Sequence, residues 1–373
     1  MSTSTSTDVN ANLKALTDAG VSIWLDQISR ALVAGGELAR LVSQESLRGV
    51  TSNPSIFEKA INETSDYDEL IQGLARDGQD AKVIFDAIAV GDVQRGTEVL
   101  RGVFDASGGR DGFVSLEVQP DLARDGDRTL ESARTYWAAV DRPNLMIKIP
   151  GTPECVFAIE QAIFEGININ ITLLFSVAAY EAVAEAYIRG LERRKAEGKS
   201  VDINSVASFF VSRVDTNADK KLAAIGGEAA KLAGTAAVAN ARAAYGRFKE
   251  IFSGERWEAL AAAGAAVQRP LWASTGTKNP AYSDTKYVDE LIAPHTVNTM
   301  PLATLRAFAD HGTVSGATAA VDPTADLEAL EQAGIDMAKV TDELLVEGIE
   351  QFVGAMRQLL DGIERRRAAF AGN

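Results

Sequence analysis

The sequence has very little of the chemistry that cysteine and histidine provide. Among its 373 residues are one cysteine, Cys155, and two histidines, His295 and His311. A single cysteine excludes an intrachain disulfide, and so few thiolate and imidazole ligands argue against a metal site built on them. We therefore expect no metal, and we expect any catalysis to rest on carboxylates and lysine. Cys155 is expected to be a small buried packing residue.

Basic residues are scarce relative to acidic ones. The chain has 37 Lys and Arg against 52 Asp and Glu, which gives a formal net charge of -15. Because a nucleic-acid surface must neutralise phosphates with a basic patch, we expect no nucleic-acid partner. An anionic small molecule would have to be held locally by a few placed cations.

Long apolar runs are also missing. No run approaches the roughly 20 residues that span a bilayer, so we expect no membrane partner. The opening "MSTSTSTDVN" is small and polar, without the basic and apolar segments of an export signal. We expect residues 1–15 to form a flexible polar tail, residues 16–373 to form one domain, and the protein to be cytoplasmic.

The sequence does contain eight short β-branched or apolar runs, separated by Ala-, Leu- and Glu-rich segments with helical spacing. The runs cover residues 21–26, 49–53, 113–118, 145–150, 169–175, 206–214, 270–275 and 295–300. Strands that alternate with helices predict parallel pairing, and eight units predict closure into an α/β fold of the (β/α)8 barrel type. A doubly wound open sheet is the alternative. We expect several helices in residues 54–112, and long C-terminal helices packed on the outside.

One of these runs, "NLMIKIPGT", carries a lysine among apolar residues. Lys148 shares a strand face with Met146 and Pro150, while Ile147 and Ile149 share the other, so neither face is typical of a solvated one. Lys148 could lie at an exposed edge strand, where lysine blocks unwanted pairing. Alternatively, burial penalises the ammonium form and favours a neutral amine that attacks carbonyls.

Polar side chains cluster at the predicted carboxyl ends of the strands, the end of a barrel where active sites lie. These residues are Asp26, Thr51, Asn53, Glu117, Lys148, Asn170, Thr172, Ser208, Arg213, Ser274, Lys278 and Asn298. One lysine, two acids, several amides and hydroxyls, and two further cations could converge on one small molecule.

Several of these residues also have a purely structural interpretation. Asp26 could cap a helix that begins near Gln27, and Asn53 before Pro54 is a common turn pair. Arg213 could simply pair with Asp215. Glu117 could face solvent, and Asn170 could belong to a satisfied polar network in the core. The joint occurrence at strand ends favours a functional site over these separate explanations.

With these residues assembled, the chain resembles the transaldolase family of class I aldolases. The resemblance rests on "GVTSNPSIFEKAI", "SLEVQPDLA", "NLMIKIPGT", "GININITLLFS", "SFFVSRVDT", "LWASTGTKNP" and "PHTVNTMP". It implies a barrel that uses no cofactor and transfers a dihydroxyacetone unit from sedoheptulose 7-phosphate to glyceraldehyde 3-phosphate, in the pentose phosphate pathway. The implied products are erythrose 4-phosphate and fructose 6-phosphate.

The resemblance also implies catalytic roles. Lys148 matches the imine-forming lysine, and Asp26 matches the aspartate that assists proton transfer at the substrate hydroxyl. Glu117 matches the acid that works through a bound water, which Thr172 helps to hold.

The remaining matches concern the sugar-phosphate substrate. The implied binding residues are Thr51, Asn53, Asn170, Ser208 and Arg213, with Lys278 as a second phosphate cation. Some relatives have an arginine where this chain offers Lys278, and "SFFVSR" departs from the "SPFVGR" form of others. Phe210 follows the transferase pattern.

Three alternatives remain open at this point. The nearest is a Schiff-base lyase of the fructose 6-phosphate aldolase type, against which Phe210 and Glu117 argue. The others are a catalytically silent barrel and a metal-dependent aldolase. The sequence does not distinguish a monomer from a homodimer.

Overall fold

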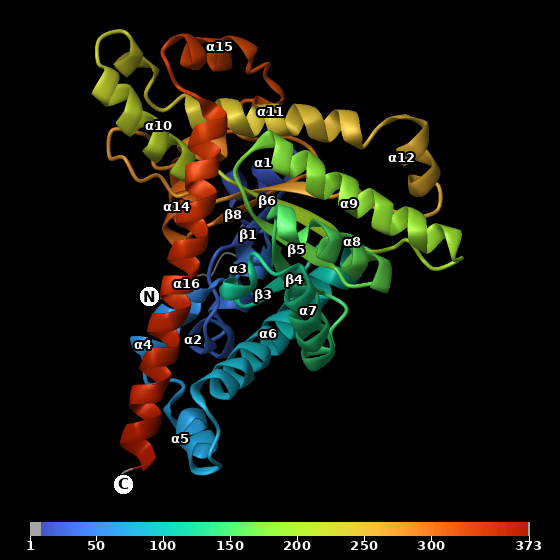
Figure 1. Cartoon of the computed structure of the whole chain (residues 1–373), viewed down its shortest axis with the longest axis vertical. Helices are drawn as coiled ribbons and strands as arrows, with labels where there is room; N and C mark the ends of the chain where they lie inside the picture. The colour runs from blue at the N-terminus through green and yellow to red at the C-terminus, as the bar shows by residue number, and fades with distance from the viewer. Residues whose placement is uncertain (1–8, 372–373) are drawn as a thin grey trace, which may run out of the picture.

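The computed structural model describes residues 9–371 as a closed barrel of eight parallel strands, arranged in the order of the sequence (Figure 1). The strands are β1 (Val21–Leu25), β2 (Leu47–Val50), β3 (Phe113–Glu117), β4 (Leu145–Pro150), β5 (Ile169–Leu174), β6 (Ser205–Phe210), β7 (Arg269–Ala273) and β8 (Thr296–Met300). Since β1 pairs with β8, the sheet has no edge. The predicted (β/α)8 barrel is confirmed, and the open-sheet alternative is wrong.

All eight apolar runs of the sequence overlap a strand, with boundaries that differ by up to four residues. The largest difference lies in the run 206–214, because β6 ends at Phe210 and helix α10 (Ser212–Ile225) begins two residues later. Arg213 therefore lies in the first turn of a helix and not in a strand. Almost every strand residue is buried, on both faces, because side chains fill the barrel interior and helices cover its outside.

Helices surround the barrel between the strands. They are α1 (Ala11–Asp18), α2 (Arg30–Ala34), α3 (Glu37–Gln44), α4 (Pro54–Asn62), α5 (Asp68–Arg76), α6 (Ala81–Ala106), α7 (Gly126–Val140), α8 (Val156–Glu165), α9 (Val177–Ala196), α10, α11 (Ala236–Ile251), α12 (Gly254–Ala261), α13 (Lys286–Asp289), α14 (Leu302–His311), α15 (Thr324–Gln332) and α16 (Met337–Ala371). Short 3₁₀ turns are η1 (Pro120–Leu122), η2 (Pro153–Cys155), η3 (Ala229–Leu232) and η4 (Thr318–Ala320).

Local sequence explains where several helices begin. The side chains of Ser29, Asp80 and Ser176 each accept a hydrogen bond from the backbone N–H three residues later, as N-cap residues do. As predicted, residues 54–112 hold several helices, namely α4, α5 and α6. None of the helices in residues 9–371 has the length and apolar character needed to cross a membrane.

The expected N-terminal tail, residues 1–15, overlaps the first helix. Residues 1–8 lie outside the described residues, but α1 already begins at Ala11, with Asn10 as its N-cap. Leu13 and Leu16 of this helix are fully buried. Residues 11–15 are thus part of the packed structure, and the predicted boundary at residue 15 is too late.

The C-terminal segment forms one 35-residue helix, α16, instead of the several helices predicted on the outside. Figure 1 shows α16 running along the molecule past α10, α4 and α5, which come from distant parts of the sequence. At Gly348 the helix lies so close to the barrel that an added Cβ would approach Leu173 to 3.0 Å. This contact places α16 against the carboxyl end of β5, beside the mouth of the barrel.

Candidate active site

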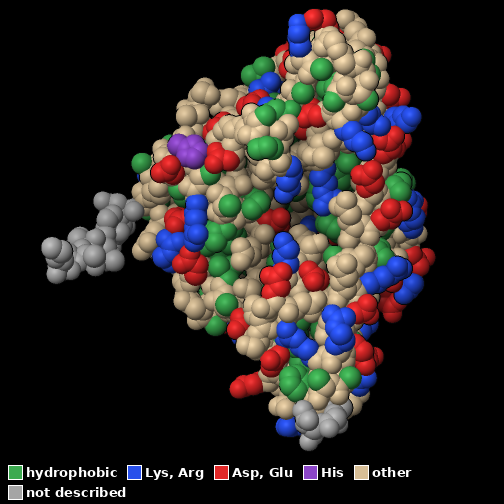
Figure 2. Space-filling view, turned by 90° about the vertical axis from the view of Figure 1, so that its left-hand side faces the viewer, with side chains coloured by type: hydrophobic (Ala, Val, Ile, Leu, Met, Phe, Trp, Pro, Cys, Tyr) green, Lys and Arg blue, Asp and Glu red, His purple; other side chains and the backbone are tan. Residues whose placement is uncertain are grey.

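A pocket of about 400 Å³ opens at the carboxyl ends of the strands. Its lining includes Asp26, Thr51, Asn53, Ser55, Lys59, Lys148, Ser208, Phe210, Arg213, Ser274, Lys278, Thr299 and Phe352. The space-filling view shows a hollow in this face, with basic and acidic side chains around it (Figure 2). Most of the residues predicted from strand ends therefore do meet in one place.

Lys148 lies at the floor of the pocket and is only 4% exposed. Its strand, β4, is paired on both sides, so the edge-strand interpretation is wrong. The register places Glu117 of β3 and Asn170 of β5 directly beside it. Lys148 Nζ lies 3.0 Å from Glu117 Oε2 and donates a hydrogen bond to the carbonyl oxygen of Ser52 at 3.1 Å.

Two carboxyl groups near Lys148 have raised pKa values. Burial raises the pKa of Glu117, an effect that the neighbouring Lys148 opposes and Asp26 reinforces. Burial also raises the pKa of Asp26, against the opposing effects of Lys148 and of a hydrogen bond from Thr51. An amine, an acid in contact with it and a second acid are the groups that Schiff-base chemistry needs.

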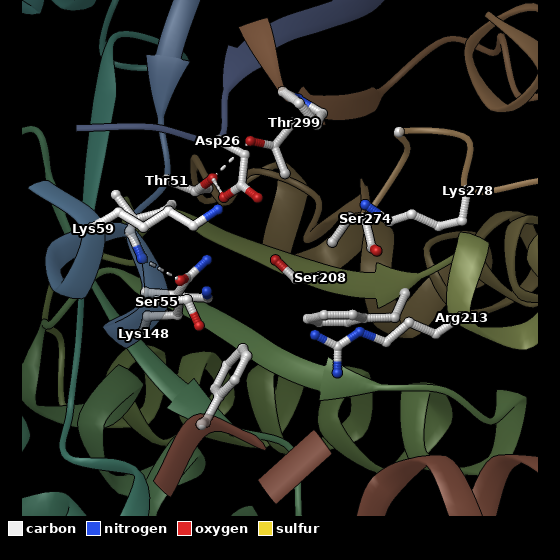
Figure 3. A pocket seen from close by; sticks show the side chains of 17 residues that line it. Asp26, Thr51, Ser55, Lys59, Lys148, Ser208, Arg213, Ser274, Lys278 and Thr299 are labelled. Atoms are coloured by element: carbon white, nitrogen blue, oxygen red, sulfur yellow. Dashed lines mark hydrogen bonds between the residues drawn. The ribbon is translucent and has the colours of Figure 1, made fainter. Parts of the chain in front are cut away.

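Asp26 is held by a chain of hydroxyl groups. Thr51 Oγ1 donates to Asp26 Oδ1 at 2.7 Å, and Thr299 Oγ1 lies 2.7 Å from Thr51 Oγ1 (Figure 3). Helix α2 begins at Arg30 with Ser29 as its N-cap, so the helix-capping interpretation of Asp26 is wrong. The carboxylate is instead oriented by Thr51, which directly follows β2, and this threonine in turn contacts Thr299 of β8.

Asn170 lies beneath the pocket in a buried polar network. Its Nδ2 donates to Ser115 Oγ at 2.9 Å, and its Oδ1 accepts from Ser208 Oγ at 2.7 Å. Ser208 lines the pocket, whereas Asn170 is fully buried and does not. The satisfied-network interpretation of Asn170 is therefore correct, and the network also fixes a hydroxyl that faces the pocket.

Thr172 follows on the same strand and is fully buried. Within residues 9–371 its Oγ1 has no hydrogen-bond partner. The register of β5 shifts between Ile171 and Leu174, and Leu173 adopts a φ of 59°. A bulge and a strained non-glycine residue next to a site are features that functional regions often carry.

Asn53 caps a helix and also lines the pocket. Its side chain accepts a hydrogen bond from Ile56 N at 3.0 Å and so caps α4, which Pro54 begins. The structure shows a helix cap at this position and not the turn pair of the alternative interpretation, and Asn53 also lines the pocket. The same cap presents the first turns of α4, with Ser55 and Lys59, to the cavity.

Arg213 and Lys278 enter the pocket from one side, with Lys59 across from them (Figure 3). The Arg213 guanidinium lies 5.3 Å from the ring centroid of Phe210 and 5.9 Å from that of Phe352. Burial lowers the pKa of Arg213, although the group stays charged. Asp215 instead bonds to Tyr287 and to the backbone, so the alternative interpretation, in which Arg213 only pairs with Asp215, is wrong.

Several pocket residues were missed from the sequence. Ser55 and Lys59 lie within the quoted motif "GVTSNPSIFEKAI", four residues apart in a segment predicted to be helical, and this spacing was an available signal. Phe352 comes from α16, and no local pattern links it to the barrel. At the last strand Thr299 lines the pocket, whereas Asn298 accepts a hydrogen bond from Thr275 at 2.9 Å.

The cysteine and histidines lie elsewhere. Cys155 is fully buried against Ala123, as expected of a packing residue, and burial raises the pKa of its thiol. Neither histidine lines the pocket. Within the described part of the chain, no group of three or more His, Cys, Asp or Glu side chains is arranged to hold a metal ion.

A (β/α)8 barrel with a buried lysine against a carboxyl group, and with cations at the pocket wall, defines the class of lysine-dependent barrel enzymes. The sequence profile of the family described as "Transaldolase/Fructose-6-phosphate aldolase" matches residues 23–363. The chain belongs to this family, which confirms the resemblance found in the motifs.

Curated relatives give the same result over nearly the full length. A protein of Thermobifida fusca called transaldolase is 50% identical to this chain over 362 residues. One of Parafrankia sp., also called transaldolase, is 50% identical to it over 364 residues. A transaldolase of Mycobacterium marinum is 49% identical over 368 residues. The matches cover 96 to 97% of this chain and 98 to 99% of these relatives.

Proposed function

We propose that the protein is a transaldolase that works through a Schiff base on Lys148. It transfers a dihydroxyacetone unit from sedoheptulose 7-phosphate to glyceraldehyde 3-phosphate, which yields erythrose 4-phosphate and fructose 6-phosphate in the non-oxidative pentose phosphate pathway. The observation that carries the proposal is the buried pair of Lys148 and Glu117, 3.0 Å apart, at the floor of a pocket with cations in its wall.

The first step forms the covalent bond. The neutral amine of Lys148 adds to the ketone carbon of the donor and gives a carbinolamine, which loses water to give the iminium. Glu117 supplies the proton for the departing hydroxyl, because its raised pKa keeps a protonated fraction. A water held by Glu117 and Thr172 relays this proton, and the unpartnered buried hydroxyl of Thr172 supports such a site.

The second step breaks the carbon–carbon bond. Asp26 accepts the proton of the hydroxyl two carbons from the iminium carbon, and the bonding electrons move to the iminium, which becomes an enamine. An aldose phosphate leaves as the aldehyde. The hydrogen bond from Thr51 orients Asp26 for this transfer.

The three-carbon unit then stays on Lys148 until an acceptor aldehyde arrives and the steps reverse. We assign its hydroxyl groups to Asn53 and Ser208, with Asn170 contributing to this binding through the Ser208 hydroxyl that it holds. The amide and hydroxyl network of Asn170 and Ser208 supports this assignment, since it fixes donors and acceptors before substrate binds.

The phosphate group is assigned to Arg213 and Lys278. Within residues 9–371 neither side chain forms a direct ion pair, so both charges are available to a ligand. Arg213 can bind phosphate through two N–H groups of its planar guanidinium, whereas Lys278 acts as a point charge.

The partners and location follow from this chemistry as part of the proposal. The substrates are sugar phosphates and no cofactor is required. We propose a cytoplasmic enzyme that acts as a monomer or homodimer and that binds neither nucleic acid nor membranes.

The experiment that tests the proposal is borohydride reduction in the presence of fructose 6-phosphate, followed by peptide mass spectrometry. We expect a dihydroxyacetone-derived adduct on Lys148 and no adduct in Lys148→Met. A folded protein that binds substrate but gives no adduct would contradict the covalent mechanism.

A coupled assay separates transfer from simple cleavage. With fructose 6-phosphate and erythrose 4-phosphate we expect glyceraldehyde 3-phosphate and sedoheptulose 7-phosphate. Steady release of free dihydroxyacetone without an acceptor would instead identify a lyase of the fructose 6-phosphate aldolase type.

A further inference from the structure

We propose that Tyr282 and Asp219 are positioning residues that hold Lys278 opposite Arg213. Lys278 lies in the segment 274–285, which connects β7 to α13 and is called the β7 loop below. Lys278 itself is exposed, and no ion pair within residues 9–371 fixes it. The position of its charge therefore depends on how the β7 loop is anchored.

The anchor is a pair of acids on α10, the helix that carries Arg213 in its first turn. Asp215 and Asp219 are four residues apart and so lie on one helix face. Tyr282 of the β7 loop donates its hydroxyl hydrogen to Asp219 Oδ2 at 2.6 Å. Tyr287, at the start of α13, donates to Asp215 Oδ2 at 2.8 Å.

The second oxygen of each acid is bound to another element. Asp219 Oδ1 accepts from Gly234 N at 2.8 Å, and Asp215 Oδ1 accepts from Ala237 N at 2.7 Å. Gly234 has a φ of 80°, and an added Cβ there would lie 2.9 Å from the Tyr282 ring. Each carboxylate of α10 thus bonds to two further segments of the chain, and the Tyr282 ring packs closely against Gly234 in one of these segments.

Hydrogen bonds within the β7 loop connect Tyr282 to the part of the loop that carries Lys278. Tyr282 N donates to Asn279 O at 3.1 Å, and Ala281 N donates to Asn279 Oδ1 at 3.0 Å. Thr277 Oγ1 donates to Ser283 O at 2.8 Å. Residues 277–283 therefore form a closed turn, and holding Tyr282 holds Lys278.

A small cavity of about 210 Å³ lies where α10 meets the β7 loop and the start of α13. Both acid–tyrosine pairs line it together with Lys278 and Asn279. Because open space lies beside the β7 loop, packing alone does not fix the position of Lys278. At its start the β7 loop also bonds to α10, through Ser274 and Ser212, whereas within residues 277–283 the described hydrogen bond to that helix is the one from Tyr282.

This inference rests on the proposed function, in which Arg213 and Lys278 bind the substrate phosphate. A lysine is a point charge without a preorganised fork, so its contribution depends on where its support places it. Loss of the Tyr282 hydroxyl should weaken binding of the phosphate and leave the chemistry at Lys148 intact.

The test compares two acceptors that differ only in the phosphate, erythrose 4-phosphate and erythrose. In a ping-pong mechanism kcat/KM for the acceptor reports the second half-reaction alone. We expect Tyr282→Phe to lower kcat/KM for erythrose 4-phosphate by about tenfold, the scale of losing one hydrogen bond to a charged group. The loss should appear in KM, with kcat and the value for erythrose nearly unchanged.

The matched control is Tyr136→Phe. Tyr136 donates to Asp86 at 2.7 Å, a bond of the same kind that lies away from the pocket. It should leave both acceptors unaffected. In a Lys278→Met background, Tyr282→Phe should cause no further loss, because residues that act through one another are not additive.

Equal losses for both acceptors, additive losses with Lys278→Met, or no loss at all would overturn the inference. Failure of the proposed function would look different. If Lys278→Met and Arg213→Met leave erythrose 4-phosphate kinetics unchanged, the phosphate assignment fails before Tyr282 is considered. If the unsubstituted protein catalyses no transfer, the proposed activity itself fails.

Discussion

At the scale of single residues, the site separates two carboxyl groups by their surroundings. Glu117 is buried and contacts Lys148 directly, whereas Asp26 receives a hydrogen bond from Thr51 and faces the cavity. Burial raises the pKa of both, so each holds its proton to higher pH than a free carboxyl group. Their different partners fit the two steps that we propose for them, proton delivery near the imine nitrogen by Glu117 and proton removal from the sugar hydroxyl by Asp26.

A third acid, Asp215, gives a prediction about stability and pH. Burial raises its pKa from 3.8 to about 6, an effect that Asp219 reinforces and that Tyr287 and Lys286 oppose. The folded state therefore binds this proton more tightly than the unfolded chain, and stability falls as pH rises from about 4 to 6. Relative to Asp215→Asn, we expect the protein to lose about 3 kcal/mol across this window.

Urea unfolding of both proteins at several pH values between 4 and 7.5 measures this difference. Asp322→Asn, at an exposed position, serves as the control. Because hydrogen bonds from Thr324 lower the pKa of Asp322, the difference in stability between the protein and this variant should not fall as pH rises. A difference between the protein and Asp215→Asn that stays constant with pH would contradict the prediction.

At the scale of elements, the strands of the barrel were predicted from the sequence more accurately than the C-terminal helix that packs over them. The eight apolar runs and the helical spacing between them specify β1 to β8, because each strand is buried on both faces and reads as a short apolar run. Lys148, Glu117 and Asp26 were predictable because the carboxyl ends of parallel strands meet at one end of a barrel. Phe352 was not, because its contact with the site depends on where the whole of α16 packs.

Phe352 leads to the second prediction, which concerns α16. Its ring is 4% exposed, and its centroid lies 5.8 Å from Lys148 Nζ. A transferase must protect the enzyme-bound three-carbon unit from water until the acceptor arrives, and an apolar ring over the lysine excludes water there. We expect Phe352→Ala to increase release of free dihydroxyacetone relative to transfer, with Phe352→Leu intermediate.

The measurement is the ratio of free dihydroxyacetone to sedoheptulose 7-phosphate, formed from fructose 6-phosphate and erythrose 4-phosphate. Val346→Ala, at an exposed position of the same helix, controls for general loosening of α16. An unchanged product ratio in a folded Phe352→Ala protein would show that this ring does not guard the intermediate.

At the scale of the whole molecule, the net charge of the protein has the same sign as the phosphate group of the proposed substrates. The net charge is -15, yet Lys59, Arg213 and Lys278 line one pocket. Contacts of a few ångströms outweigh the field of distant surface charges, which salt screens beyond about 10 Å at 0.1 M. An acidic protein can therefore bind an anion if its few placed cations lie at the site.

The distribution of histidines over the molecule gives the last prediction. His311 lies at the end of α14, where hydrogen bonds to Asp284 and Asp310 raise its pKa, and His295 adopts a φ of 60° before β8. Neither side chain lines the active-site pocket. We expect the double variant His295→Asn, His311→Gln to keep the pH profile of kcat/KM, since asparagine tolerates the left-handed backbone at position 295.

Treatment with EDTA should leave this activity unchanged, because the proposed chemistry uses an amine and carboxyl groups. Glu117→Gln is the informative contrast. It removes a group whose raised pKa contributes to the profile, so activity should fall by about 10² to 10⁴, the usual contribution of a general acid. If the histidine variant shifted the profile and Glu117→Gln did not, proton transfer would depend on imidazole, and the assignment of the acid to Glu117 would be wrong.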